Sequence, residues 1–193
     1  MILLLSTLLA CSGDEPAVAP VRSGRFDAPV APPSTGPDPT LTDFCEVHHT
    51  AADAPRFAYP ELDEPAPAAT DAWRWVNVWA TWCGPCVEEM PMLVTWQARL
   101  EKEGLPAQLE FLSVDAKAED VTKWRASHAA APPSVRVKTF SLVAPWLGTL
   151  GVGADAVIPI HAFVAPDGGL RCVRTGAVDD GHYATIKKLI SGG

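Results

Sequence analysis

A strand-like run leads directly into two closely spaced cysteines and then into a helix. Residues 73–79 read Trp-Arg-Trp-Val-Asn-Val-Trp, and such β-branched and aromatic residues are typical of a buried strand. Residues 83–86 read Cys-Gly-Pro-Cys, and residues 85–103 carry apolar side chains at helical spacing. Cys83 is therefore expected at a helix N-terminus, where unpaired N–H groups and the helix dipole favour a thiolate.

The spacing of these two cysteines fits redox exchange. Cys83 is the candidate nucleophile, and Cys86, one helical turn further on, can resolve a mixed disulfide. Half of a zinc site is the alternative. Zinc needs further Cys or His ligands at short spacing, and the next 41 residues supply none before His128. We therefore predict no metal at this pair.

The remaining hydrophobic pattern alternates between strands and helices. Asp115 is a candidate cap for the helix that follows the second strand. The order predicts an α/β fold, with a mixed central sheet flanked by helices on both faces. Strands are expected at residues 109–114, 157–164 and 170–175, a hairpin turn at 167–169, and helices at 118–128, 141–150 and from 179 or 180 to 190.

The segment Trp82-Cys83-Gly84-Pro85-Cys86 resembles the active-site sequence of thioredoxins. Its surroundings are similar to the TlpA/ResA-like thiol-disulfide oxidoreductases of bacterial cell envelopes. Asn77 stands where thioredoxins proper carry a buried Asp, and the stretch between residues 115 and 159 resembles this family's central insert. The resemblance spans residues 57–193 and implies a thioredoxin-like fold with an N-terminal extension and a central insert.

The resemblance also implies the residues of the site. Glu89 matches the family's active-site glutamate, although a solvent-facing helix glutamate is the alternative. Ile158-Pro159 matches the family's cis-proline, which packs opposite the redox cysteines and helps receive the substrate backbone. The implied catalytic residues are Cys83, Cys86 and Glu89, and the implied substrate-binding residues are Trp82, Gly84, Pro85, Ile158 and Pro159.

His161 departs from the family's pattern. Residues 159–163 read Pro-Ile-His-Ala-Phe, where Pro-Thr-Thr-Phe is usual. Two interpretations stay open, a titratable group near the thiols or a partly buried strand histidine with a hydrogen-bond partner. We favour the second.

The N-terminus resembles that of a bacterial lipoprotein. Residues 1–10 form an apolar run too short to span a bilayer but long enough for a signal-peptide core, although no Lys or Arg precedes it. The run ends in Leu-Leu-Ala followed by Cys11, which resembles a lipobox with Cys11 as the acylated residue. An N-terminal core helix is the alternative. We expect export and a membrane anchor through Cys11.

Composition divides the rest of the chain into a tether and a domain. Residues 11–40 are rich in Pro, Ala, Ser, Gly and Asp, and bury too little apolar surface to fold. Residues 11–72 hold 11 acidic and 3 basic residues and therefore the whole net charge of −8. We expect a tether at 11–40 and a thioredoxin-like domain at 41–193. The acidic balance, without a Lys/Arg cluster, argues against nucleic-acid binding.

Cys45 and Cys172 remain after these assignments. In an exported protein an even leftover pair suggests a structural disulfide, and two free buried thiols are the alternative. Residues 45–49, Cys-Glu-Val-His-His, could bind copper or zinc, but their Pro-rich surroundings predict a flexible loop.

Together these features predict a monomeric, periplasm-facing thiol-disulfide oxidoreductase with no bound cofactor beyond its redox-active disulfide. The Gly84-Pro85 pair resembles that of reducing thioredoxins, so we expect a reductant recharged by a membrane thiol-reductant conduit. Family resemblance implies substrates such as apocytochrome c thiols or metal-site cysteines of a copper enzyme. The alternatives are a disulfide-forming oxidase, a copper metallochaperone using Cys83, Cys86 and His161, and a binding domain with an incidental disulfide.

Overall fold

The computed structural model describes residues 38–68 and 70–192. The expected signal peptide, the lipidation site Cys11 and the tether up to residue 37 lie outside the described residues. The strands are β1 (Val47–His48), β2 (Trp73–Trp79), β3 (Ala107–Ser113), β4 (Ser134–Arg136), β5 (Ile160–Val164) and β6 (Leu170–Thr175). The helices are α1 (Pro39–Phe44), α2 (Gly84–Lys102), α3 (Ala118–Ser127), α4 (Val143–Thr149) and α5 (Tyr183–Ser191), with short 3₁₀ turns at 140–142 and 180–182.

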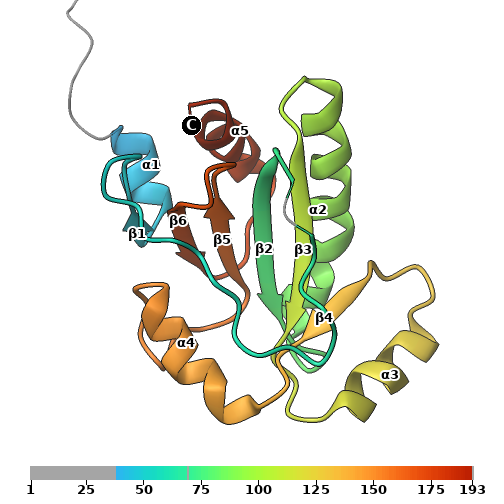
Figure 1. The fold of residues 1–193 in the computed structure, drawn as a ribbon. Helices are drawn as coiled ribbons and strands as arrows, with labels where there is room; N and C mark the ends of the chain where they lie inside the picture. The colour runs from blue at the N-terminus through green and yellow to red at the C-terminus, as the bar shows by residue number, and fades with distance from the viewer. Residues whose placement is uncertain (1–37, 69, 193) are drawn as a thin grey trace, which may run out of the picture. The chain divides into compact units, whose positions relative to one another are not determined.

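The strands form one mixed sheet in the order β1-β6-β5-β2-β3-β4 (Figure 1). β2, β3 and β4 run parallel, whereas β5 pairs antiparallel with both β2 and β6, and β1 is antiparallel to β6. Because β5 is antiparallel to β2, the residues just before β5 lie beside the carboxyl end of β2. This topology confirms the mixed α/β sheet and brings the two cysteines after β2 close to the turn before β5.

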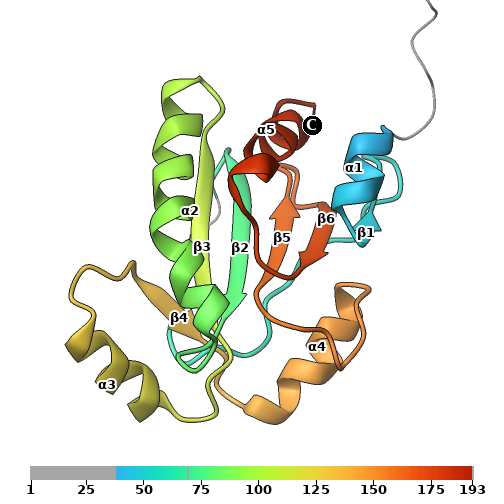
Figure 2. The same ribbon diagram turned by 180° about the vertical axis from the view of Figure 1, so that it is seen from behind.

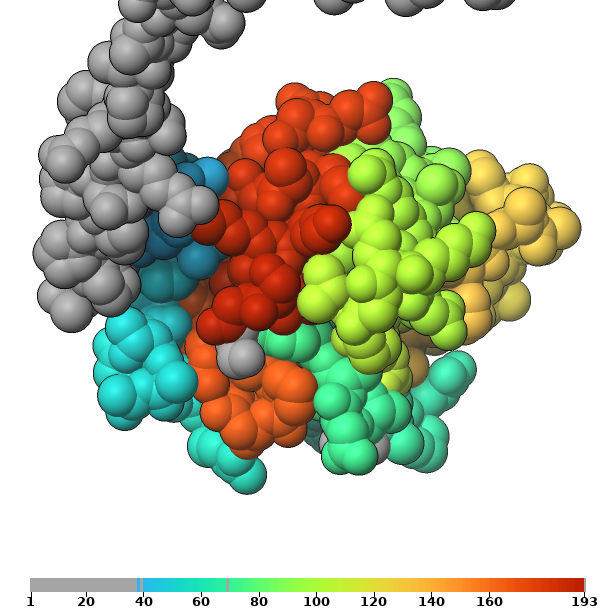
Figure 3. Space-filling view, turned by 90° about the horizontal axis from the view of Figure 1, so that it is seen from above, coloured from blue at the N-terminus to red at the C-terminus, as the bar shows by residue number. Residues whose placement is uncertain are grey.

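Helices α2 and α5 cover one face of the sheet (Figure 2) and lie side by side (Figure 3). The ring of Trp75 on β2 stacks between Trp96 of α2 and Phe163 of β5 within the core. Residues 49–68 cross the other face (Figure 1), where the Trp146 indole of α4 donates to the Ala58 carbonyl at 2.9 Å. No helix in the described ranges has both the length and the apolar character needed to cross a membrane.

Three expectations about local structure are wrong. Asp115 does not cap α3, because the N-cap residue is Lys117 and no side chain caps that helix. Residues 45–49 are not a flexible loop, because β1 pairs with β6 there. The strand expected from residue 157 begins only at Ile160, since Ile158-Pro159 is a cis peptide that leads into β5.

The contact between the end of α2 and α5 leads to a prediction about acid stability. Glu103 accepts hydrogen bonds from Lys187, Arg99 and Tyr183. Lys187 and then Arg99 lower the pKa of Glu103 from 4.5 to about 2. Because the folded-state pKa is depressed, this contribution to stability is present above the usual pKa and is lost as pH falls through the window from 4.5 to about 2.

We expect Glu103→Gln to flatten the loss of melting temperature across that acidic window, measured by thermal denaturation at closely spaced pH values. Glu101→Gln is the matched control, because Glu101 is an exposed residue on the same turn of α2. Equal pH dependence in the wild type and the Glu103→Gln variant would contradict the assignment.

Candidate functional site

The two cysteines of the Cys-Gly-Pro-Cys motif lie at the start of α2, just beyond the end of β2. They form a disulfide with their Cα atoms 5.3 Å apart. Cys83 is the N-cap residue of α2, and its Sγ accepts from the Cys86 amide at 3.3 Å. Cys83 is 6% exposed and Cys86 is fully buried, so an incoming thiol or disulfide reaches Cys83 first. This asymmetry fits Cys83 as the attacking sulfur and Cys86 as the resolving one.

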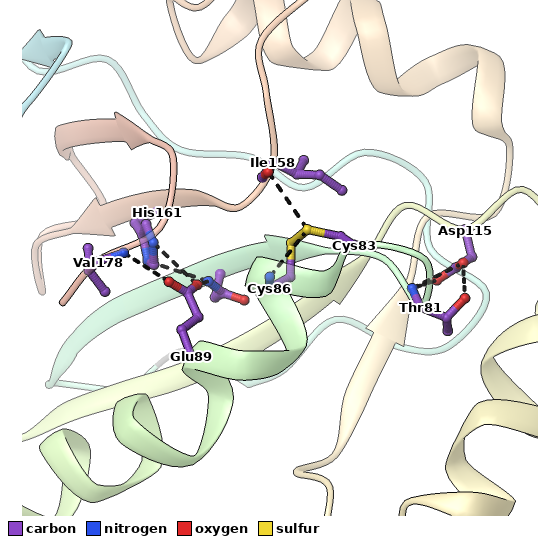
Figure 4. The surroundings of a disulfide bond; sticks show 9 residues. Thr81, Cys83, Cys86, Glu89, Asp115, Ile158, His161 and Val178 are labelled. Atoms are coloured by element: carbon purple, nitrogen blue, oxygen red, sulfur yellow. Dashed lines mark hydrogen bonds and ion pairs between the residues drawn. A yellow bond between two sulfur atoms is a disulfide. The ribbon is translucent and has the colours of Figure 1, made fainter.

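The buried carboxylate of Asp115 holds the loop between β2 and the cysteines. It accepts hydrogen bonds from the Thr81 amide at 3.0 Å and the Thr81 hydroxyl at 2.7 Å (Figure 4). It also accepts from the Ser113 hydroxyl at 2.8 Å. Sequence reasoning missed this role. The signal was present, because Asp115 follows β3 as Thr81 follows β2, and the carboxyl ends of parallel neighbouring strands meet at one edge of the sheet.

The cis-proline turn lies against Cys83. The carbonyl oxygen of Ile158 is 3.7 Å from Cys83 Sγ (Figure 4), close enough for a reduced Cys83 thiol to donate to it. Ile158 is half-buried and Pro159 is buried. The expected juxtaposition of the proline turn and the dithiol is therefore present.

Exposed residues lie beside and between the two cysteines in the chain. Trp82 is 68% exposed, and Gly84 and Pro85 are also exposed. Val157, which precedes the cis-proline turn, is 70% exposed and was not singled out in the sequence. Because Trp82 precedes Cys83 and Val157 precedes the cis-proline turn, these exposed apolar side chains are candidates for substrate contact.

Glu89 is buried, so the structure does not support a solvent-facing helix glutamate. Only 4% of the residue is exposed, and its carboxylate accepts from the Asn77 side-chain amide at 2.8 Å and the Val178 backbone amide at 3.0 Å. It lies one helical turn beyond Cys86 on α2 (Figure 4). The site therefore contains a buried carboxylate next to the resolving cysteine.

His161 is fully buried on β5, in register with Asn77 on β2. Its Nδ1 accepts from the Trp75 indole N–H at 3.2 Å, and its Nε2 lies 3.4 Å from a Glu89 carboxylate oxygen. The structure supports the second sequence interpretation, a strand histidine with a hydrogen-bond partner, although His161 is fully and not partly buried. Within residues 38–68 and 70–192, no three or more His, Cys, Asp or Glu side chains are grouped so that they could hold a metal ion.

Cys45 and Cys172 form a second disulfide, away from the dithiol in sequence and in the sheet. Cys45 ends α1, and Cys172 lies in β6, opposite His48 of β1. The bond joins residues 127 positions apart, and both cysteines are buried. It fastens the N-terminal segment to the edge of the sheet.

Comparison with family models and with curated protein sequences finds no match. Solved structures do match. A thioredoxin-related protein from Neisseria meningitidis is similar with 27% identity and a TM-score of 0.52, over 66% of this chain and 90% of the other. The chain therefore has a thioredoxin-like fold. A secreted thiol-disulfide isomerase from Corynebacterium glutamicum, with 17% identity, a TM-score of 0.55, and coverage of 75% and 91%, shares the fold.

The N-terminal domain of PilB from Neisseria gonorrhoeae has the same fold, with 20% identity and a TM-score of 0.51 over 68% of this chain and 85% of the other. On this fold, the Cys83–Cys86 disulfide supports a thiol-disulfide oxidoreductase that resembles the TlpA/ResA-like proteins. The expected fold is thereby confirmed, and the expected enzyme class is supported.

Proposed function

We propose that this thioredoxin-like protein reduces disulfides of exported proteins at the bacterial cell envelope. The observation that carries the proposal is the position of Cys83, which caps α2 beside the Ile158 carbonyl and is less buried than Cys86. A helix N-terminus stabilises the thiolate that attacks a disulfide. The exposed Trp82 and Val157 side chains supply apolar surface for a polypeptide substrate.

The exchange takes two steps. The Cys83 thiolate attacks one sulfur of the substrate disulfide, and the other sulfur leaves as a thiolate. The Cys86 thiolate then attacks Cys83 Sγ, which re-forms the internal disulfide and releases the second substrate thiolate. Two electrons have passed from the dithiol to the substrate. A membrane thiol-reductant conduit returns them to the protein, and no bound cofactor is needed.

Glu89 supports the second step. Cys86 is buried, so its proton has no direct path to water when the thiolate forms. A carboxylate one helical turn away can take that proton as a general base. We assign this role to Glu89, with Asn77 and the Val178 amide fixing its orientation.

The proposed location depends on the N-terminal segment. Cys11 would carry a lipid anchor, and residues 11–40 would tether a monomeric domain on the periplasmic side of a membrane. The proposed substrates are apocytochrome c thiols or metal-site cysteines of a copper enzyme. Both present cysteines that must be kept reduced.

A redox titration tests the direction of electron flow. The full chain with Cys11→Ser is equilibrated in glutathione and dithiothreitol buffers, and each cysteine is scored by alkylation and mass spectrometry. We expect a Cys83–Cys86 potential at or below about −270 mV, the range of reducing thioredoxins. A potential near about −120 mV would contradict the proposal and assign disulfide formation instead.

A further inference from the structure

A buried polar cluster joins three elements beneath the dithiol. It consists of Trp75 and Asn77 on β2, Glu89 on α2 and His161 on β5. Each of these residues is at most 4% exposed. Figure 4 shows Glu89 directed towards His161 and Val178. Burying polar groups costs free energy unless they form hydrogen bonds. The donors and acceptors of the cluster therefore determine where its protons lie.

The Trp75 indole fixes the tautomer of His161. An indole nitrogen is only a donor, and Trp75 Nε1 lies 3.2 Å from His161 Nδ1. The Asn77 side-chain nitrogen, a second donor, is 3.4 Å from the same atom. Nδ1 must therefore offer a lone pair. In the neutral ring the proton then resides on Nε2.

The Nε2–H group lies beside a carboxylate. Its carboxylate neighbour is Glu89 Oε1 at 3.4 Å, and no standard hydrogen bond to Nε2 is formed within the described part of the chain. The same Oε1 accepts from Asn77, and Oε2 accepts from the Val178 amide. Asn77 and the Val178 amide thus each donate an N–H to the Glu89 carboxylate, and the His161 Nε2 atom lies beside it.

Few charged side chains lie near Glu89 and His161. Arg174 on β6 is in register with His161, but its guanidinium donates to the Phe44 carbonyl and lies over the Phe44 ring. On α2 the neighbouring titratable groups are Cys86, one turn before Glu89, and the adjacent Glu88, which is exposed. A positive charge on His161 would need a proton on Nδ1, where Trp75 already directs an N–H.

We infer that His161 is a positioning residue that places its Nε2–H beside the Glu89 carboxylate, and that Trp75 fixes the imidazole in the tautomer this requires. The inference rests on the proposed role of Glu89 as the base for Cys86. It explains why a histidine occupies a fully buried strand position next to a redox pair. The inference also gives the two groups different roles. Glu89 accepts the Cys86 proton, whereas His161 retains its own proton on Nε2.

The tautomer is tested by ¹⁵N NMR of the imidazole in the full chain, without reference to activity. We expect a protonated Nε2 and an unprotonated Nδ1 in the wild type. In Trp75→Phe, which removes the indole N–H and keeps a ring, we expect a mixture of tautomers. A proton on Nδ1 in the wild type, or a Trp75→Phe spectrum identical to the wild type, would overturn the inference.

The effect on Glu89 is tested by the pH profile of disulfide exchange. His161→Leu removes the N–H group beside the carboxylate that is proposed to take the Cys86 proton. We expect exchange at acidic pH to slow by about fivefold and the midpoint of the profile to rise by about 0.7 pH unit. His161→Gln, which retains an N–H donor, should restore most of the wild-type profile. Thermal melting identifies any variant that has merely unfolded.

The Glu89→Gln variant distinguishes a failure of the proposed role of Glu89 from a failure of the inference about His161. If Glu89→Gln leaves the pH profile unchanged, the proposed role of Glu89 fails and the inference about His161 fails with it. If Glu89→Gln moves the profile and a folded His161→Leu variant does not, only the inference about His161 is overturned. If the two single variants shift the profile and the double variant adds nothing beyond Glu89→Gln, His161 acts through Glu89.

Discussion

Cys83→Ser is expected to lower the rate of disulfide exchange by at least about a thousandfold, because it removes the attacking sulfur. Cys86→Ser should instead keep the first step and stop at a mixed disulfide, because nothing remains to displace the bound substrate from Cys83. Both results follow from the placement of Cys83 as the N-cap of α2 and from the burial of Cys86.

The measurement pairs exchange kinetics on a model disulfide substrate with non-reducing electrophoresis and mass spectrometry of the adducts. Each serine variant is the matched control of the other. An adduct on Cys86 in the Cys83→Ser variant, with none on Cys83 in the Cys86→Ser variant, would reverse the two roles. The absence of adducts from both variants would favour a binding domain with an incidental disulfide.

Removal of the second disulfide should have the largest effect on stability. The Cys45–Cys172 bond closes a loop of sequence separation 127, and it restricts the unfolded chain accordingly. We expect Cys45→Ala/Cys172→Ala to lower the free energy of unfolding by about 4 kcal/mol in urea denaturation at equilibrium.

The Cys83→Ala/Cys86→Ala double variant is the matched control, because its disulfide spans only three positions. It should cost about 3 kcal/mol less than loss of the long-range bond. Equal losses for the two double variants would mean that loop closure is not the source of the stabilisation.

Much of the fold could be predicted because its longer elements carry clear patterns. The expected strands at 73–79 and 170–175 agree with β2 and β6, and the expected helices agree to within a few residues. The sequence analysis missed α1, β1 and β4. A strand of two or three residues is too short to display an alternating pattern, and its existence depends on the neighbour with which it pairs.

The candidate site divides in the same way. Cys83 and Cys86 are identified by a local motif, because their redox chemistry needs two cysteines only three positions apart in the chain. The contacts of Glu89 are not local, because Val178 is 89 positions away and reaches it only through the order of the strands. The pairing of Trp75 with His161, 86 positions apart, likewise depends on the register between β2 and β5.

The sheet has two edges in the described part of the chain, and both are made of very short strands. β1 contributes two residues and β4 three. A longer bare edge would present a row of free N–H and C=O groups to which a strand of another molecule could add. β6 would be such an edge if β1 detached, but the Cys45–Cys172 bond keeps β1 covalently beside it. The disulfide that is not used in catalysis therefore also guards the sheet against intermolecular strand pairing and aggregation.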